Sequence, residues 1–256
     1  MPMSSTTGEN IHELKERIAA LAKSEGNAKR IIGDLLAPTD VVILVTPIDS
    51  SAPKGRMILP QVQTIRDILD SYAMCMVVQT EQLPAALNAL SAPPKLVITD
   101  SQVFGKVKSM VSDDIPLTSF SILMARVKGF LETAAKGAAF IEQLRDGDTV
   151  LISEGCTHHR QCEDIGTVKL PGWIRKHTGR ELNFEFTSGG AFPEDLPKEK
   201  YAMIVHCGGC MLNEREMQYR MRCAEDAGIP FTNYGTLIAY MNGILKRSLS
   251  GIGMEL

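Results

Sequence analysis

Runs of apolar, mostly β-branched residues recur along the chain, and most are followed by a segment with apolar residues at helical spacing. Strands that are apolar throughout are typical of parallel sheets covered by helices on both faces. We therefore predict an α/β fold made of two successive βα-repeat domains with mainly parallel sheets. The predicted strands are residues 41–45, 73–78, 95–99, 115–120, 149–153, 182–186, 201–205 and 230–232.

The helical segments between these strands divide the chain into three regions. The alternation of strands and helices restarts after residue 120, so we predict a tail, helix and linker over 1–35, a first domain over 36–119 and a second over 120–256. Gly129 and Gly137 are weak points of a long predicted helix. The predicted helices are residues 10–23, 58–72, 81–90, 102–110, 121–144, 163–177, 213–227 and 236–247.

Composition narrows the possible partners and the compartment. The chain has 256 residues, 44% of them apolar, and a net charge of −3, which argues against nucleic acid because phosphate binding leaves a basic footprint. No apolar run approaches the roughly 20 residues that cross a bilayer, and the first ten residues lack a signal-peptide pattern. We expect a cytoplasmic protein whose six cysteines are reduced and serve as buried, metal-binding or catalytic residues, with Cys75 and Cys223 in the core.

Three cysteines follow predicted strands. Cys156 comes shortly after strand 149–153, and Cys207 and Cys210 come after strand 201–205. Ligands of open parallel sheets gather at the carboxyl ends of strands, and a Cys-x-x-Cys pair allows two thiolates to bind one metal. The sequence therefore predicts one metal centre held by these three thiols.

The remaining ligand and the kind of centre stay open at this point. A [4Fe-4S] cluster with one exchangeable iron and a zinc ion both suit three thiols. The chain is then a carrier, an Fe–S lyase or hydratase with a Lewis-acid iron, or a zinc-stabilised structural module. Cys162 is a weaker competing ligand. The candidates for the fourth position are Glu163, His158 and His206, and those for cargo or supporting contacts are His159 and Arg160.

Cys156-Thr157-His158, followed after a long gap by His206-Cys207-Gly208-Gly209-Cys210, resembles the C-x-H…H-C-x-x-C signature of the HydF family of [FeFe]-hydrogenase maturation scaffolds. Further segments that are similar to that family are residues 33–36, 47–49, 52–56, 59–67 and 154–160.

One departure from that family is large. Its members begin with a GTP-binding domain that carries a Gly-x-x-x-x-Gly-Lys-Ser/Thr loop. The only Gly-Lys pair here, Gly105-Lys106, has Asp100 in place of the first glycine and Val107 in place of the hydroxyl residue. The chain therefore resembles the family without its GTPase, and we expect no GTP site.

The resemblance implies roles for both domains. Residues 36–119 would be a dimerisation domain that forms a homodimer, and residues 120–256 an iron–sulfur cluster-binding domain. The cofactors implied are a [4Fe-4S] cluster and a transient di-iron precursor. The partners implied are radical-SAM maturases, which load the precursor, and apo-[FeFe]-hydrogenase, which receives it. A scaffold of this kind is not itself an enzyme.

Overall fold

The structure is a computed structural model that describes residues 1–22, 29–48, 55–157, 164–193 and 195–255. Residues 1–30 form one compact unit and residues 31–256 a second. The first unit contains α1 (Ile11–Ala22), in which Arg17 forms an ion pair with Glu13, one turn earlier, at 2.7 Å. No helix in the described part of the chain is long and apolar enough to span a bilayer.

The second unit begins with a four-stranded, all-parallel sheet in the order β2-β1-β3-β4. Its strands are β1 (Val41–Val45), β2 (Met74–Val78), β3 (Leu96–Thr99) and β4 (Leu117–Ser119). The helical segments that accompany it are η1 (Gly33–Leu35), α2 (Leu59–Asp70), η2 (Thr80–Gln82), α3 (Leu83–Ala89), η3 (Ser101–Val103) and α4 (Phe104–Lys108).

A second sheet repeats this topology. It is again parallel throughout, and its order β6-β5-β7-β8 corresponds strand for strand to that of the first. Its strands are β5 (Thr149–Glu154), β6 (Asn183–Ser188), β7 (Met203–His206) and β8 (Phe231–Asn233). Its helical segments are α5 (Phe120–Val127), α6 (Leu131–Ala138), η4 (Ala139–Gln143), η5 (Ile165–Lys169), α7 (Leu170–Thr178), α8 (Glu214–Asp226), α9 (Tyr234–Met241) and α10 (Leu245–Ser250).

The predicted fold class is confirmed: two parallel sheets are flanked by helices. The boundary predicted at residue 120 falls between β4 and α5, and the division into domains at that point stays a prediction. The single helix predicted over residues 121–144 is wrong. Gly129 separates α5 from α6. It adopts φ +75°, a backbone conformation that residues with a Cβ rarely adopt. Likewise, the helix predicted over residues 236–247 is divided by Gly243, at φ +67°.

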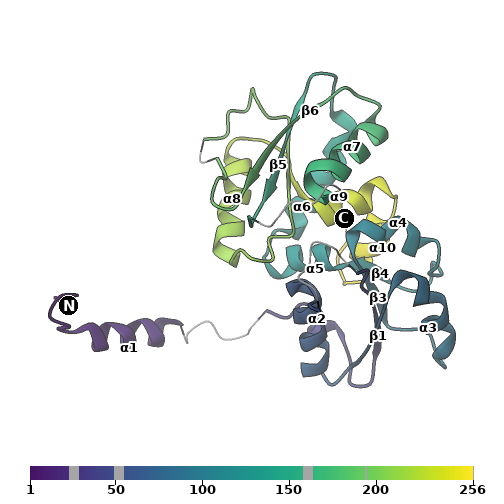
Figure 1. Cartoon of the computed structure of the whole chain (residues 1–256), viewed down its shortest axis with the longest axis horizontal. Coiled ribbons are helices and arrows are strands. Elements are labelled where there is room, and N and C mark those ends of the chain that lie inside the picture. Colours follow the sequence, from purple (N-terminus) through teal and green to yellow (C-terminus); the bar gives the residue numbers. More distant parts are fainter. Residues whose placement is uncertain (23–28, 49–54, 158–163, 194, 256) are drawn as a thin grey trace. The chain divides into compact units, whose positions relative to one another are not determined.

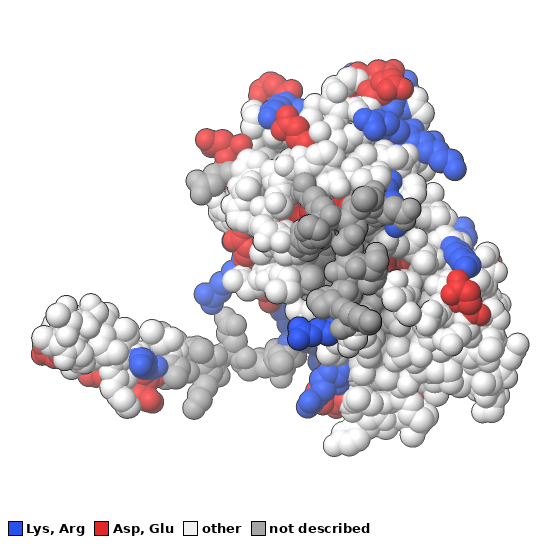
Figure 2. Space-filling view, viewed as in Figure 1, with Lys and Arg blue, Asp and Glu red and all other residues white. Residues whose placement is uncertain are grey.

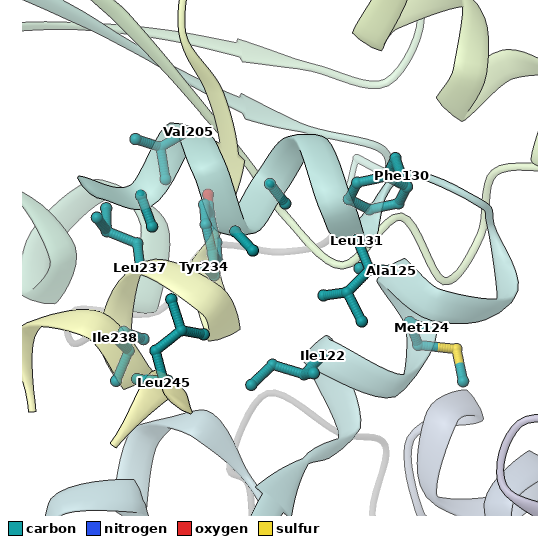
Figure 3. Packing of buried hydrophobic residues seen from close by; sticks show 14 of the residues in the cluster. Ile122, Met124, Ala125, Phe130, Leu131, Val205, Tyr234, Leu237, Ile238 and Leu245 are labelled. Atoms are coloured by element: carbon teal, nitrogen blue, oxygen red, sulfur yellow. The ribbon is translucent and has the colours of Figure 1, made fainter. Parts of the chain in front are cut away.

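One continuous core connects the two sheets. The alternation of side chains along β1 explains how the first sheet joins it: Val42 and Leu44 belong to this core, whereas Ile43 and Val45 belong to a separate cluster on the other face. Helices α5, α6, α9 and α10 lie between the sheets (Figure 1). Figure 3 shows apolar side chains of these helices and of β7 within this core, among them Ile122 of α5, Leu237 of α9 and Val205 of β7.

Candidate functional site

Two neighbouring strands bring the predicted cysteines to one edge of the second sheet. β5 ends two residues before Cys156, and β7 ends directly before Cys207, with Cys210 three residues further on. The Cys207 amide donates to the Ser153 carbonyl at 2.8 Å, which extends the pairing of β5 and β7 by one residue. From β5 the chain crosses to β6 on one side, and from β7 it crosses to β8 on the other side. The junction between β5 and β7 is therefore the topological switch point of the sheet. The two cysteine-bearing segments therefore lie side by side.

Backbone amides surround the Cys207 thiol. Gly155, which precedes Cys156, donates its N–H to the Cys207 Sγ at 3.1 Å, and Gly209 donates at 3.4 Å. Gly209 adopts φ +63°, and an added Cβ would lie 2.4 Å from the sulfur of Met217. A glycine is thus required for the loop to wrap closely around the sulfur. Amides directed at a sulfur favour its negatively charged form, as a metal-bound thiolate requires.

The three thiols interact electrostatically. The Cys207 residue is partly exposed, but its thiol lies deep enough that burial raises its pKa to about 12; the negative charges of Cys210 and Cys156 add to this shift, and the two amides oppose it. Burial also raises the pKa of Cys210. In the metal-free site Cys207 and Cys210 are therefore favoured as protonated thiols, and binding of a metal would displace their protons.

Lys128 brings a positive charge to the same site from the end of α5. Its Nζ donates to the carbonyl of Leu212, beyond the Cys-x-x-Cys turn. Partial burial lowers its pKa, whereas the charges of Cys210 and Glu214 act in the opposite direction. A cation here compensates negative charge on the thiolates.

His206 is the last residue of β7, directly before Cys207, and is fully buried. Its Nε2 lies 3.1 Å from Nη1 of Arg220, and its Nδ1 lies 2.8 Å from the Cys207 carbonyl. A guanidinium only donates hydrogen bonds, so Nε2 accepts and Nδ1 carries the proton that it donates to Cys207. Both ring nitrogens are thus occupied. The role of fourth ligand predicted for His206 would require the Arg220 contact to break.

Several predicted residues lie outside the part of the chain that the structure describes: His158, His159, Arg160, Cys162 and Glu163. Among the described residues, no group of three or more His, Cys, Asp or Glu side chains is arranged to hold a metal ion. The metal-binding role of Cys156, Cys207 and Cys210 therefore stays a prediction.

Sequence reasoning did not identify Arg220 and Lys128 as part of this site. A signal for Arg220 was available. Met217, Arg220 and Ala224 follow helical spacing and are all buried, so an arginine occupies a core position of an amphipathic helix. Lys128 carries no such signal, because its place depends on how α5 packs against a loop more than eighty residues away.

Burial of His206 predicts a pH-dependent stability. Burial lowers its pKa to about 4, the Arg220 charge adds to this shift, and the Cys207 carbonyl opposes it. The unfolded chain binds a proton at this histidine near pH 6.5, whereas the folded chain remains neutral there until about pH 4. The contribution of His206 to the free energy of unfolding is therefore fully present above pH 6.5. It falls by about 1.4 kcal/mol per pH unit as the pH is lowered towards 4.

Urea unfolding of the metal-free protein at pH 7.5 and pH 5.0 tests this dependence. We expect His206→Gln to lose about 2 kcal/mol less than the wild type between these pH values. His12→Gln is the matched control, because His12 is an exposed residue of α1 outside the unit of residues 31–256. An equal loss in His206→Gln and in the wild type would contradict the assignment.

Comparison with known proteins connects this architecture to one family. Residues 31–129 match the family model described as the hydrogen maturase F dimerization domain, and residues 132–251 match that of the hydrogen maturase F tetramerization domain. No curated protein matches the chain. A solved structure of aspartate transcarbamoylase from Trypanosoma cruzi in complex with phosphate is 8% identical over 91% of this chain and 88% of that one, with a TM-score of 0.25, too low to bear on fold or function.

Proposed function

The chain belongs to the hydrogen maturase F family, and on this premise we propose that it is a scaffold that binds a [4Fe-4S] cluster through Cys156, Cys207 and Cys210. The family points to a role in hydrogenase maturation, and its two matched domains support self-association. The observation that carries the proposal is the placement of the cysteine-bearing segments at the carboxyl ends of β5 and β7, with two amides directed at one sulfur.

The donor set fits such a cluster. Thiolates are the usual ligands of iron–sulfur clusters, and hydrogen bonds from amides to the sulfurs are among the features that tune them. The Gly208-Gly209 turn lets the backbone approach the Cys207 sulfur closely, and Lys128 offsets part of the negative charge of the thiolates. When bound, the cluster would supply an iron with one exchangeable position.

The protein residues then hold the centre while the cargo is exchanged. Three thiolates would anchor it, and His158, Glu163 or solvent would complete the fourth position. His159 and Arg160 would contact the anionic cargo. The cargo is the di-iron precursor, which radical-SAM maturases load and apo-[FeFe]-hydrogenase receives. We assign no GTP binding to this chain, because Gly105-Lys106 lacks the glycine and hydroxyl residues of a phosphate-binding loop.

Anaerobic reconstitution with iron and sulfide tests the proposal. We expect the wild type to bind about four irons and four sulfides per chain. Alanine in place of Cys156, Cys207 or Cys210 should abolish uptake, because each removes one of three anchoring thiolates.

Cys75→Ala and Cys223→Ala are the matched controls. Cys75 lies in β2 of the other sheet and Cys223 within α8, and both are half-buried thiols outside the site. They should keep full iron and sulfide content. A colourless wild-type protein that retains zinc would favour a structural zinc module and overturn the proposal.

A further inference from the structure

A buried arginine lies behind the cysteine site. Arg220, on α8, is only 1% exposed and is the largest fully buried side chain among the described residues. Charged side chains are almost never fully buried unless they are paired, so a guanidinium in this position must have specific partners.

Its partners come from separate elements. Nε donates to Oε1 of Glu216 at 2.8 Å within α8, Nη1 donates to Nε2 of His206 at the end of β7, and Nη2 donates to the carbonyl of Gly189 at 2.7 Å, just beyond β6. The ring of Phe192 lies 5.1 Å from the guanidinium carbon and covers it. The planar guanidinium holds its donors in a fixed relation, so it fixes these segments relative to one another.

Each of two contacts leads to a different cysteine loop. His206 passes the connection to the Cys207 carbonyl through its Nδ1–H, 2.8 Å away. Gly189 adopts φ +59°, and an added Cβ there would lie 2.9 Å from the Thr157 methyl, so its backbone packs against the residue that follows Cys156. Arg220 thereby supports the Cys207–Cys210 turn on one side and the Cys156 loop on the other.

We propose that Arg220 is a positioning residue that holds the Cys156 loop beside the Cys207–Cys210 turn, so that all three thiols bind one metal centre. This inference rests on the proposed function. Arg220 is not itself a ligand, because a guanidinium has no lone pair to offer a metal. A purely structural arginine would instead contribute to stability without changing which thiols share a metal.

Titration of the metal-free chain with cobalt(II) separates these roles, because each bound thiolate adds to the sulfur-to-cobalt charge-transfer absorption. We expect Cys156→Ala to lower this absorption by roughly one third in the wild-type background, as one of three thiolates is lost. In an Arg220→Met background the absorption should already be lowered, and adding Cys156→Ala should change nothing further.

Arg222→Met is the matched control, with the same substitution at an exposed position of the same helix. It should retain the wild-type absorption and the full response to Cys156→Ala. If Arg220→Met does not fold, Arg220→Lys gives the same comparison, because lysine keeps the charge but offers one ammonium in place of a planar fork.

Two results would overturn the inference. One is that Cys156→Ala lowers the charge-transfer absorption as much in the Arg220→Met background as in the wild type. The other is that Cys156→Ala leaves the absorption unchanged when Arg220 is present. Cobalt alone reports thiol placement, whether or not an iron–sulfur cluster assembles. A three-thiolate cobalt site in a chain that takes up no iron and sulfide would therefore refute the proposed function while leaving the role of Arg220 supported.

Discussion

Gly137→Ala is expected to lower the free energy of unfolding by about 2–3 kcal/mol, although the same change at an unobstructed helical position is favourable. Gly137 lies in α6 where this helix packs against β8. An added Cβ would lie 2.1 Å from the Phe231 carbonyl oxygen and 2.7 Å from its carbon. Both atoms belong to the backbone of a buried strand, so the helix itself must move away.

That movement would disturb contacts on both sides of the substitution. Thr232 donates its hydroxyl to the Ala134 carbonyl at 2.7 Å, and the rings of Phe130 and Phe231 meet edge to face with centroids 6.0 Å apart. These groups are buried, so a gap between α6 and β8 removes dispersion contacts and leaves a hydrogen bond unmade.

Gly172→Ala is the matched control for urea unfolding. Gly172 lies in α7, and nothing lies within 4 Å of an added Cβ there. Its stability should be unchanged or raised by up to about 1 kcal/mol. If Gly137→Ala were as stable as Gly172→Ala, the close approach of α6 to β8 would be wrong.

Gly137 also illustrates what the sequence could and could not reveal. Both Gly129 and Gly137 interrupt a helical pattern, and pattern alone does not separate them. Gly129 ends a helix through a positive φ, whereas Gly137 remains within one because a strand distant in sequence needs the space. Local conformation and tertiary packing thus lead to the same residue type for different reasons.

The strands were more predictable than the helix ends. Residues such as those of β1 are apolar throughout because both faces are covered, and this signal survives without tertiary information. The cysteine-bearing loops were likewise predictable, since carboxyl ends of neighbouring parallel strands share an edge. The Arg220 contacts to His206 and Gly189 were not, because they join separate elements with no fixed sequence spacing.

Among the described residues, no further strand pairs with the β2 edge of the first sheet. β4 is fully buried and contacts α10, whereas β2 is the other terminal strand of the sheet and is partly exposed. Met74 donates its N–H to the Asp40 carbonyl beside β1, so the alternation of a parallel ladder turns the amides of Cys75 and Val77 away from the sheet. Amides that face away from a sheet in this way favour pairing with another strand.

Exposed apolar side chains surround this edge, although α2 also carries the exposed ion pair Arg66–Asp70. Figure 2 shows charged side chains of both signs over α2 and few over the part of the molecule that contains β1 and α3. Exposed apolar side chains of α2 and β2, and of the turn between them, are Leu59, Val62, Leu69, Tyr72, Met74 and Val77. A two-fold axis beside β2 would pair this strand with its copy, and Met74 and Val77, on opposite faces of the strand, would both become part of a self-complementary edge.

The double substitution Met74→Lys and Val77→Lys is therefore expected to weaken self-association by about 100-fold or more. Met74 is 51% and Val77 42% exposed, so lysine is tolerated in the single chain. Successive residues of a strand point to opposite faces, so across a two-fold axis the substitutions place two positive charges on each face of the joined edge, where like charges cost several kcal/mol. Light scattering at micromolar concentration should show the particle mass halved relative to the wild type.

Val168→Lys, at a valine of η5 that is 51% exposed, provides the control and should keep the wild-type mass. A double variant that also kept that mass would place the dimer contact elsewhere than at β2.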